Sequence, residues 1–175
     1  VDLIVGLSGQ EWIVNSGTPG VGGSPISPTN LNAQQQSAWG SSETVSGMVI
    51  GDAIFYPQRN GTTIRQLLFS IATQKYMSAD LMTLAQHLSQ SGIKCMDFEA
   101  QFENQGIVWI VNGVGQLCGM TYEIEQEVFG WHRHLTGEDV VSGYTSTDTF
   151  ECVSVIPGTG TTDDEVWVVV SRQVY

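Results

Sequence analysis

Residues 107–122 read IVWIVNGVGQLCGMTY, and this stretch carries the pattern that decides the predicted fold. An apolar run rich in β-branched and aromatic residues leads into a turn at Gly113, and a second run follows. Strands favour residues of this kind, and a glycine between two such runs is typical of a hairpin. The segment therefore predicts two antiparallel strands joined at Gly113.

The same pattern occurs twice more, nearer the N-terminus. The turn glycines are 52 residues apart both times (61 − 9 and 113 − 61). A period near 50 with several strands per unit is typical of propeller blades. A fourth unit begins at VWVVVSRQVY, after a longer connection, GTGTTDDE. The two further copies are LIVGLSGQEWIV at 3–14, with Gly9, and IFYPQRNGTTIRQLLF at 54–69, with Gly61.

We therefore predict a mainly β fold of antiparallel, propeller-like blades, a partial propeller with one short α-helix; a sandwich or barrel is the alternative. Residues 1–175 are interpreted as one fragment of a larger domain, because the chain opens directly on strand-like residues and closes on another strand. Its blade-like units would be about 1–50, 51–104 and 105–165, with a fourth starting at 166–175. The expected strands are Leu3–Leu7, Glu11–Val14, Val45–Ile50, Ala53–Pro57, Thr63–Ser70, Cys95–Gln101, Ile107–Val111, Gln116–Glu123, Glu127–His134, Glu151–Pro157 and Glu165–Arg172.

The predicted helix is Ser78–Ser91. Ser78 suits the N-cap, and Asp80 lies in the first turn, where the helix dipole favours an acid. Gly92 is placed to end the helix with a positive φ. Spacings of i, i+3, i+4 and i+7 would give one apolar stripe, made of Leu81, Leu84, Ala85 and Leu88.

The composition excludes some functions. Six Lys and Arg against 18 Asp and Glu give a net charge of −12, which argues against binding nucleic acid through its phosphates. No apolar run approaches the length of about 20 residues that a membrane span needs. Residues 15–30, rich in Gly, Pro and Ser, predict a long loop. Its GVGGS lacks the lysine of a phosphate-binding loop, so that interpretation is rejected.

The segment EQEVFGWHRHLTG, residues 125–137, holds two of the three histidines. On a strand, His132 and His134 would share one face and Trp131 would point to the other. A metal would need a third ligand, and no spacing brings His87 near them. Acid–base use of His132 with Glu125 or Glu127 is a second alternative. The favoured interpretation is that Phe129 and Trp131 anchor the strand in a core, with the histidines hydrogen-bonded or at a surface.

Other chemistry-bearing residues also favour structural roles. The widely spaced Cys95, Cys118 and Cys152 are expected to be buried free thiols. Asp97 with Glu99, and Glu123 with Glu125, share strand faces but are expected to be solvated, and Asp163–Glu165 lacks the spacing of a calcium loop. Of the five tryptophans, four lie in expected strands, where core packing is the interpretation. We thus predict no catalytic, cofactor-binding or metal residues, and no enzyme.

Several ordered blocks resemble bacteriophage tail proteins of the nozzle or tail-hub type of short-tailed phages. The resemblance covers nearly the whole chain. The chain departs from that pattern at Ser171–Arg172, where two arginines are usual, and in SGYTSTD at 142–148, which looks like an insertion. The blocks are SGQEWIV (8–14), SPTNLNAQQQSAWGSS (27–42), VIGDAIFYPQRNGTTIRQLLFS (49–70), ADLMTLAQHL (79–88), GIVWIVNGVGQLCGMTYEIEQEVFGWHRHLTG (106–137) and FECVSVIPGTGTTDDEVWVVVSR (150–172).

The resemblance implies a virion structural protein containing a β-propeller, assembled as a homo-oligomeric ring with other tail proteins around the DNA channel. It implies assembly in the host bacterial cytoplasm and a final location in the virion tail. DNA would pass without specific binding, which fits an acidic wall that repels phosphates. A carbohydrate- or receptor-binding β module is the alternative, and a hydrolase on a propeller scaffold is a further one. Open edge strands would also favour association of the fragment.

Overall fold

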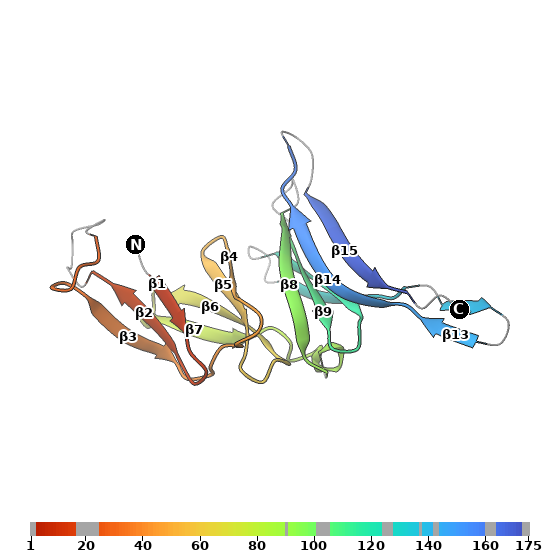
Figure 1. Ribbon diagram of the computed structural model, residues 1–175. Coiled ribbons are helices and arrows are strands. Elements are labelled where there is room, and N and C mark those ends of the chain that lie inside the picture. Colours follow the sequence, from red (N-terminus) through yellow and green to blue (C-terminus); the bar gives the residue numbers. More distant parts are fainter. Residues whose placement is uncertain are drawn as a thin grey trace.

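The computed structural model describes residues 3–16, 25–89, 91–100, 106–123, 128–136, 138–141, 144–159 and 164–172 (Figure 1). These residues form fifteen strands and one 3₁₀ helix, so the prediction of a mainly β fold is confirmed. The elements are β1 (Leu3–Gly6), β2 (Glu11–Asn15), β3 (Asn32–Ser37), β4 (Met48–Ile50), β5 (Ala53–Pro57), β6 (Ile64–Ser70), β7 (Lys75–Asp80), η1 (Gln86–Leu88), β8 (Ile93–Ala100), β9 (Gly106–Asn112), β10 (Leu117–Glu123), β11 (Val128–His134), β12 (Glu138–Val141), β13 (Tyr144–Thr147), β14 (Thr149–Ile156) and β15 (Glu165–Ser171).

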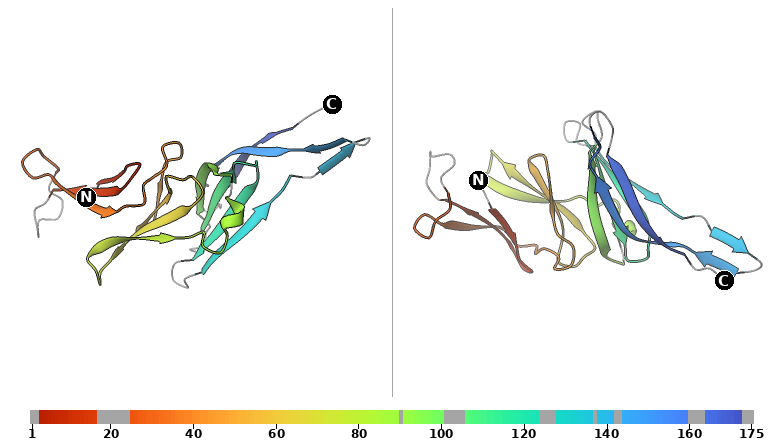
Figure 2. Two further views of the ribbon diagram at one scale, coloured as in Figure 1. Left: turned by 90° about the horizontal axis from the view of Figure 1, so that it is seen from below. Right: turned by 45° about the horizontal axis from the view of Figure 1, so that its top comes forward.

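Each strand pairs antiparallel with a strand next to it in the sequence. The sheets have the orders β1-β2-β3, β4-β5-β6-β7, β8-β9-β10-β11, β12-β13 and β14-β15. They follow one another in a row, with β1-β2-β3 at one end and β14-β15 near the other (Figure 1 and Figure 2). The two four-stranded sheets therefore repeat the same up-and-down arrangement, one after the other.

The sheet β8–β11 is packed on both of its faces. Val108 and Ile110 belong to a core shared with the sheet β4–β7 and residues 82–88, whereas Trp109 and Val111 belong to a core shared with β14 and β15. Successive side chains of a strand point to opposite faces, so a doubly covered sheet needs apolar residues at every position. This explains why β9 reads as an unbroken apolar run.

The helix predicted for Ser78–Ser91 is wrong. Residues 75–80 form β7, in which Ser78 lies opposite Leu67 of β6. The backbone N–H of Met82 donates to the Asp80 carboxylate (2.7 Å) in a tight turn at the end of β7. Pairing along β6 satisfies the backbone groups of β7 and outweighs a weak helix propensity. Leu84, one of the four residues of the expected stripe, is 96% exposed, and the helical part of the described segment is the 3₁₀ turn at 86–88.

Two glycines with a positive φ are also separated by 52 residues. Gly40 and Gly92, 52 residues apart (92 − 40), have φ values of +75° and +86° and lie before the two four-stranded sheets. The Gly40 carbonyl accepts the N–H of Arg59 (3.0 Å), and the Gly92 carbonyl accepts the N–H of Gly113 (2.8 Å). The glycine turn of each four-stranded sheet is therefore bonded to the segment that leads into that sheet. The positive φ predicted for Gly92 is confirmed, although no helix precedes it.

Other elements were not expected. Strands β3, β12 and β13 were not among the predicted strands, and β3, with the sequence NAQQQS, has no apolar alternation. It forms because its backbone pairs with β2.

The boundaries expected at residues 51 and 105 fall inside sheets, since β4 and β8 precede them. Residues 17–24 of the predicted loop lie outside the described residues. In the described part of the chain, no helix has the length and hydropathy to cross a bilayer.

Candidate functional site

The strand with two histidines is β11, at the edge of the sheet β8–β11. The rings of His132 and His134 pack on Trp109 of β9, with centroid distances of 5.6 and 5.3 Å. Trp131 points to the other face, where its indole N–H donates to the Leu81 carbonyl (2.9 Å). The predicted alternation and the anchoring by Trp131 are confirmed. Phe129, also expected in a core, is 41% exposed.

A glycine lies beneath these rings. Gly119 of β10 is opposite Trp109 on one side and His132 on the other. A Cβ at Gly119 would come within 2.3 Å of His132 Nε2 and 3.0 Å of Trp109 Cζ3, so the rings fill the space that a side chain would need. Burial, and then the neighbouring His134, lower the pKa of His132. The lowered pKa favours the neutral form of the His132 ring, which packs edge-on against Trp109.

The structure brings His87 nearer to this strand than the sequence suggested. His87 lines a shallow hollow of about 450 Å³ together with Trp131, His132 and Arg133. Among the described residues, no group of three or more His, Cys, Asp or Glu side chains could hold a metal ion. Glu125 and Glu127, the proposed acid–base partners, lie outside the described residues.

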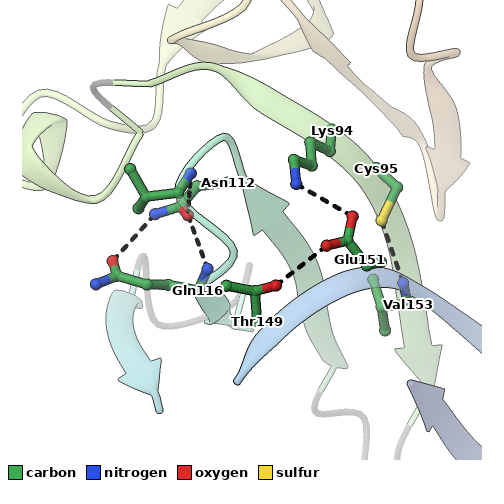
Figure 3. Close-up of polar contacts among 8 residues, drawn as sticks. Lys94, Cys95, Asn112, Gln116, Thr149, Glu151 and Val153 are labelled. Carbon is green, nitrogen blue, oxygen red and sulfur yellow. Dashed lines mark hydrogen bonds and ion pairs between the residues drawn. The ribbon is translucent and has the colours of Figure 1, made fainter. Parts of the chain in front are cut away.

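Side chains of β8 bond to the backbone of β14 across the junction between two sheets (Figure 3). The N–H of Val153 donates to Cys95 Sγ (3.1 Å), and the N–H of Val155 donates to Asp97 Oδ2 (2.8 Å). Alternate N–H groups of a strand point to the same side. Two side chains that are two residues apart on β8 can therefore accept hydrogen bonds from two alternate N–H groups of β14. Asp97, considered above as half of a carboxylate pair, holds β14 in place.

An ion pair lies beside the two hydrogen bonds that make up the β8–β14 ladder. Lys94 Nζ is 3.3 Å from Glu151 Oε2, and Thr149 donates to the other oxygen of Glu151 at 3.1 Å (Figure 3). The hydrogen bond from Lys94 is the largest cause of the lowered pKa of Glu151. Both ion-pair side chains are exposed, so the pair contributes little to stability.

The turn between β9 and β10 is held by a buried amide. Asn112 Nδ2 donates to the Leu88 carbonyl (2.8 Å) and to Gln116 Oε1 (3.1 Å). Its Oδ1 accepts the N–H groups of Val114 (3.2 Å) and Gln116 (2.9 Å) (Figure 3). The side chain is 2% exposed and uses both its donor and acceptor atoms, as a buried amide must.

Four of the five described sheets are connected in a row by backbone hydrogen bonds at these turns. The three bonds are Ser41 N–H to Leu7 O (2.8 Å), Ile93 N–H to Gly61 O (2.8 Å) and Phe150 N–H to Gly115 O (2.9 Å). We call this row of contacts the turn seam. It joins all four successive sheets, whereas β12-β13 lies outside it.

A groove of about 510 Å³ lies between β1 and the segment 41–49. Glu11, one of its lining residues, is buried, and the hydroxyls of Ser37 and Ser41 donate to its carboxylate, the second at 3.2 Å. Tyr56 also lines the groove; burial raises its pKa, and its hydroxyl shares a hydrogen bond with Ser78 (2.9 Å). The rest of the lining is mainly apolar.

The remaining candidates divide between core and surface. All three cysteines are free, but only Cys118 is buried; Cys95 is half-buried and Cys152 is exposed. Burial raises the pKa of Cys95 and of Cys118 to about 11, so both are poor nucleophiles. Trp109 packs in a core as predicted, whereas Trp167 is exposed although it lies in a strand.

The sequence interpretation missed the β8–β14 ladder, the Asn112 amide and the buried Glu11. For Asn112, an Asn-Gly pair between two apolar runs was an available signal. The other two depend on segments distant in the sequence and carry no local signal. Comparison with known proteins found no matching family model and no matching curated sequence.

Proposed function

We propose that the chain is a structural part of a virion, a piece of a propeller-like phage tail nozzle or hub ring through which DNA passes. The observation that carries this proposal is the succession of antiparallel sheets of one strand order, stacked face to face and joined by the turn seam. Propeller blades are built from sheets of this kind in radial repetition. The sequence blocks that resemble nozzle proteins extend over the same sheets.

The roles of the polar residues support a structural function. Asp97 and Asn112 bond to backbone groups of neighbouring segments, and the histidines of β11 pack on Trp109. The two polar side chains hold neighbouring segments together, and the histidines pack within their own sheet. The net charge of −12 suits a wall past which DNA slides, because like charges repel phosphates.

The carbohydrate-binding alternative has weaker support. Trp39 and Trp167 are 50% and 59% exposed, as a sugar platform requires. However, the Arg65 guanidinium lies 3.6 Å from the ring centroid of Trp39 and occupies one of its faces. Trp167 lies on β15, near the other end of the row of sheets (Figure 1). The two rings therefore make no common platform.

Immunogold electron microscopy tests the tail assignment. Antibodies raised against the purified chain would be applied to phage particles from the source of the sequence, with pre-immune serum as the control. We expect gold at the tail. Gold on the capsid, or labelling no greater than with pre-immune serum, would contradict the proposal.

A gel-shift experiment tests whether the chain lets DNA pass without binding it. The chain would be mixed with short duplex DNA at about 50 mM salt, where phosphate contacts are strong. We expect no retention of the DNA, with a basic DNA-binding protein as positive control. Tight binding at this salt concentration would refute the conducting role.

A further inference from the structure

The strands β8 and β14 lie side by side and run in the same direction at the junction between their sheets. Lys94 Nζ of β8 lies 3.3 Å from Glu151 Oε2 of β14. Further along both strands, the Ser154 hydroxyl donates to Asp97 Oδ2 at 3.3 Å. Both contacts join residues that are 57 positions apart. The constant separation means that a residue between them on β8 lies next to the residue 57 positions later on β14.

Two cysteines occupy such a pair of positions. Cys95 of β8 and Cys152 of β14 are separated by 57 residues (152 − 95). The backbone N–H of Val153 donates to Cys95 Sγ at 3.1 Å (Figure 3), which places this sulfur within about 6 Å of Cys152 Cα, two bonds from that nitrogen. Burial is the largest cause of the raised pKa of Cys95, and a hydrogen bond with the Cys152 thiol adds to it. The two thiols are therefore in contact across the junction.

Bulges in both strands explain how consecutive residues reach across the same junction. The pairing register of β8 skips Lys94, and that of β14 skips Glu151, so each cysteine directly follows a bulged residue. In a regular strand, consecutive side chains point to opposite faces. A bulge breaks this alternation and re-aims the side chains beside it. The ion pair and the pair of thiols can therefore lie next to one another.

We propose that Cys95 and Cys152 form a disulfide bond under oxidising conditions, and that this bond links β8 covalently to β14 and stabilises the junction. Cys152 is exposed and can meet an oxidant, whereas Cys95 is half-buried beside it. Cys118 is buried in the core shared with the sheet β4–β7, so it should remain a thiol. The inference goes beyond the proposed function and does not depend on it, because it needs only the chain and a disulfide oxidant.

The oxidant is a small external disulfide, for which oxidised glutathione is the probe. The Cys152 thiolate attacks one of its sulfurs, forms a mixed disulfide and expels one glutathione thiolate. The Cys95 thiolate then attacks Cys152 Sγ and expels the second glutathione. Two protein thiols thus lose two protons and two electrons, which convert one oxidised glutathione into two reduced molecules. The raised pKa makes Cys95 a poor nucleophile, but its contact with Cys152 makes the second step intramolecular, which offsets this.

Mass mapping of the purified 175-residue chain tests the proposal. The reduced chain would be treated under native conditions with excess oxidised glutathione, then alkylated and digested without reduction. Cleavage after Glu99 separates Cys95 from Cys118, which lie in one tryptic peptide. We expect a link between Cys95 and Cys152 within one chain, with Cys118 alkylated. Three alkylated thiols, a lasting glutathione adduct on Cys152, or a link to Cys118 or between chains would overturn the proposal.

Single substitutions separate the two steps of the reaction. Cys95→Ser should stop at the mixed disulfide, with one glutathione bound to Cys152, because the second thiol is missing. Cys152→Ser should leave Cys95 as a thiol. Cys118→Ala is the matched control, since it removes the cysteine outside the pair and should cross-link like the wild type. Circular dichroism checks that each variant folds, and the mapping of the wild type does not depend on them.

Thermal unfolding tests whether the bond stabilises the junction. A disulfide restricts the unfolded chain, so the oxidised wild type should have a Tm about 5–10 °C above that of the reduced protein. Added dithiothreitol should reverse the rise, and Cys95→Ser treated with the same oxidant should show none. A cross-linked wild type that unfolds at or below the Tm of the reduced chain would overturn the stabilising role.

Discussion

Strands β9 and β15 contain nearly the same apolar sequence, IVWIV at 107–111 and VWVVV at 166–170, yet their environments differ. Trp109 of β9 is 9% exposed, whereas Trp167 of β15 is 59% exposed. The sheet of β9 has neighbours on both faces, whereas in the described residues β15 pairs only with β14 and contributes to one core. Local composition makes both segments strands, and their neighbours decide how much each contributes to stability.

The two tryptophans give the most direct test of this comparison. Trp109→Ala removes a buried ring that packs against both histidines, and should lower the free energy of unfolding by about 3–5 kcal/mol. Trp167→Ala should change it by about 0.5 kcal/mol or less. Urea denaturation of both variants and the wild type at one protein concentration measures both effects. Equal changes in the free energy of unfolding would mean that the difference in burial between Trp109 and Trp167 does not affect stability.

A second pair of variants extends the comparison to the backbone of the enclosed sheet. A Cβ at Gly113 would come within 1.9 Å of the Ser91 carbonyl oxygen, where the Gly113 N–H is bonded to the Gly92 carbonyl. Gly113→Ala should therefore destabilise by about 2–3 kcal/mol through overpacking. Gly130→Ala, on the edge strand β11, meets nothing within 4 Å and should stay within about 0.5 kcal/mol. Thermal unfolding followed by circular dichroism ranks the two variants, and a harmless Gly113→Ala would argue against close packing between the Gly113 turn and Ser91.

The amide of Asn112 tests whether buried hydrogen bonds strengthen the enclosed sheet. Asn112→Ala leaves the Leu88 carbonyl and the N–H groups of Val114 and Gln116 without this partner, and should cost about 2 kcal/mol. Asn60→Ala is the matched control, since Asn60 makes an exposed bond to the N–H of Thr62 (3.1 Å) in another turn. It should cost about 0.5 kcal/mol. Chevron analysis of both variants would also show whether the loss appears in the unfolding rate.

The smallest expected effect is a dependence on pH through His132. Its pKa in the folded chain is lowered by burial and by His134, so the unfolded chain binds the proton more readily. The contribution of the neutral ring is complete above the unfolded pKa of about 6.5. It is lost as pH falls below that value towards the lowered folded pKa. His132→Gln should flatten the stability profile between about pH 7 and 5 compared with the exposed-site control His87→Gln. An unchanged slope would show that His132 is not the group responsible.

Much of the architecture could be predicted from short stretches of sequence. The hairpins around Gly9, Gly61 and Gly113 were predicted because apolar runs and a turn glycine are local signals. The helix predicted for 78–91 was wrong because a non-local interaction outweighed the local signal. Its helical spacing is real, but the open edge of β6 offered residues 75–80 a full set of backbone partners. Strand β3 was missed because glutamines give no alternation, and only pairing with β2 makes it a strand.

The sequence alone determined the strand class, the turn positions, the 52-residue repeat and the acidic charge, since these depend on residues close together along the chain. Only the tertiary structure decided that β14 is held by Cys95 and Asp97, through bonds to residues 58 positions away. It likewise decided that Trp109 is enclosed while Trp167 is exposed. Burial and long-range hydrogen bonds depend on which sheets come to lie side by side, and no local pattern of residues specifies that neighbour.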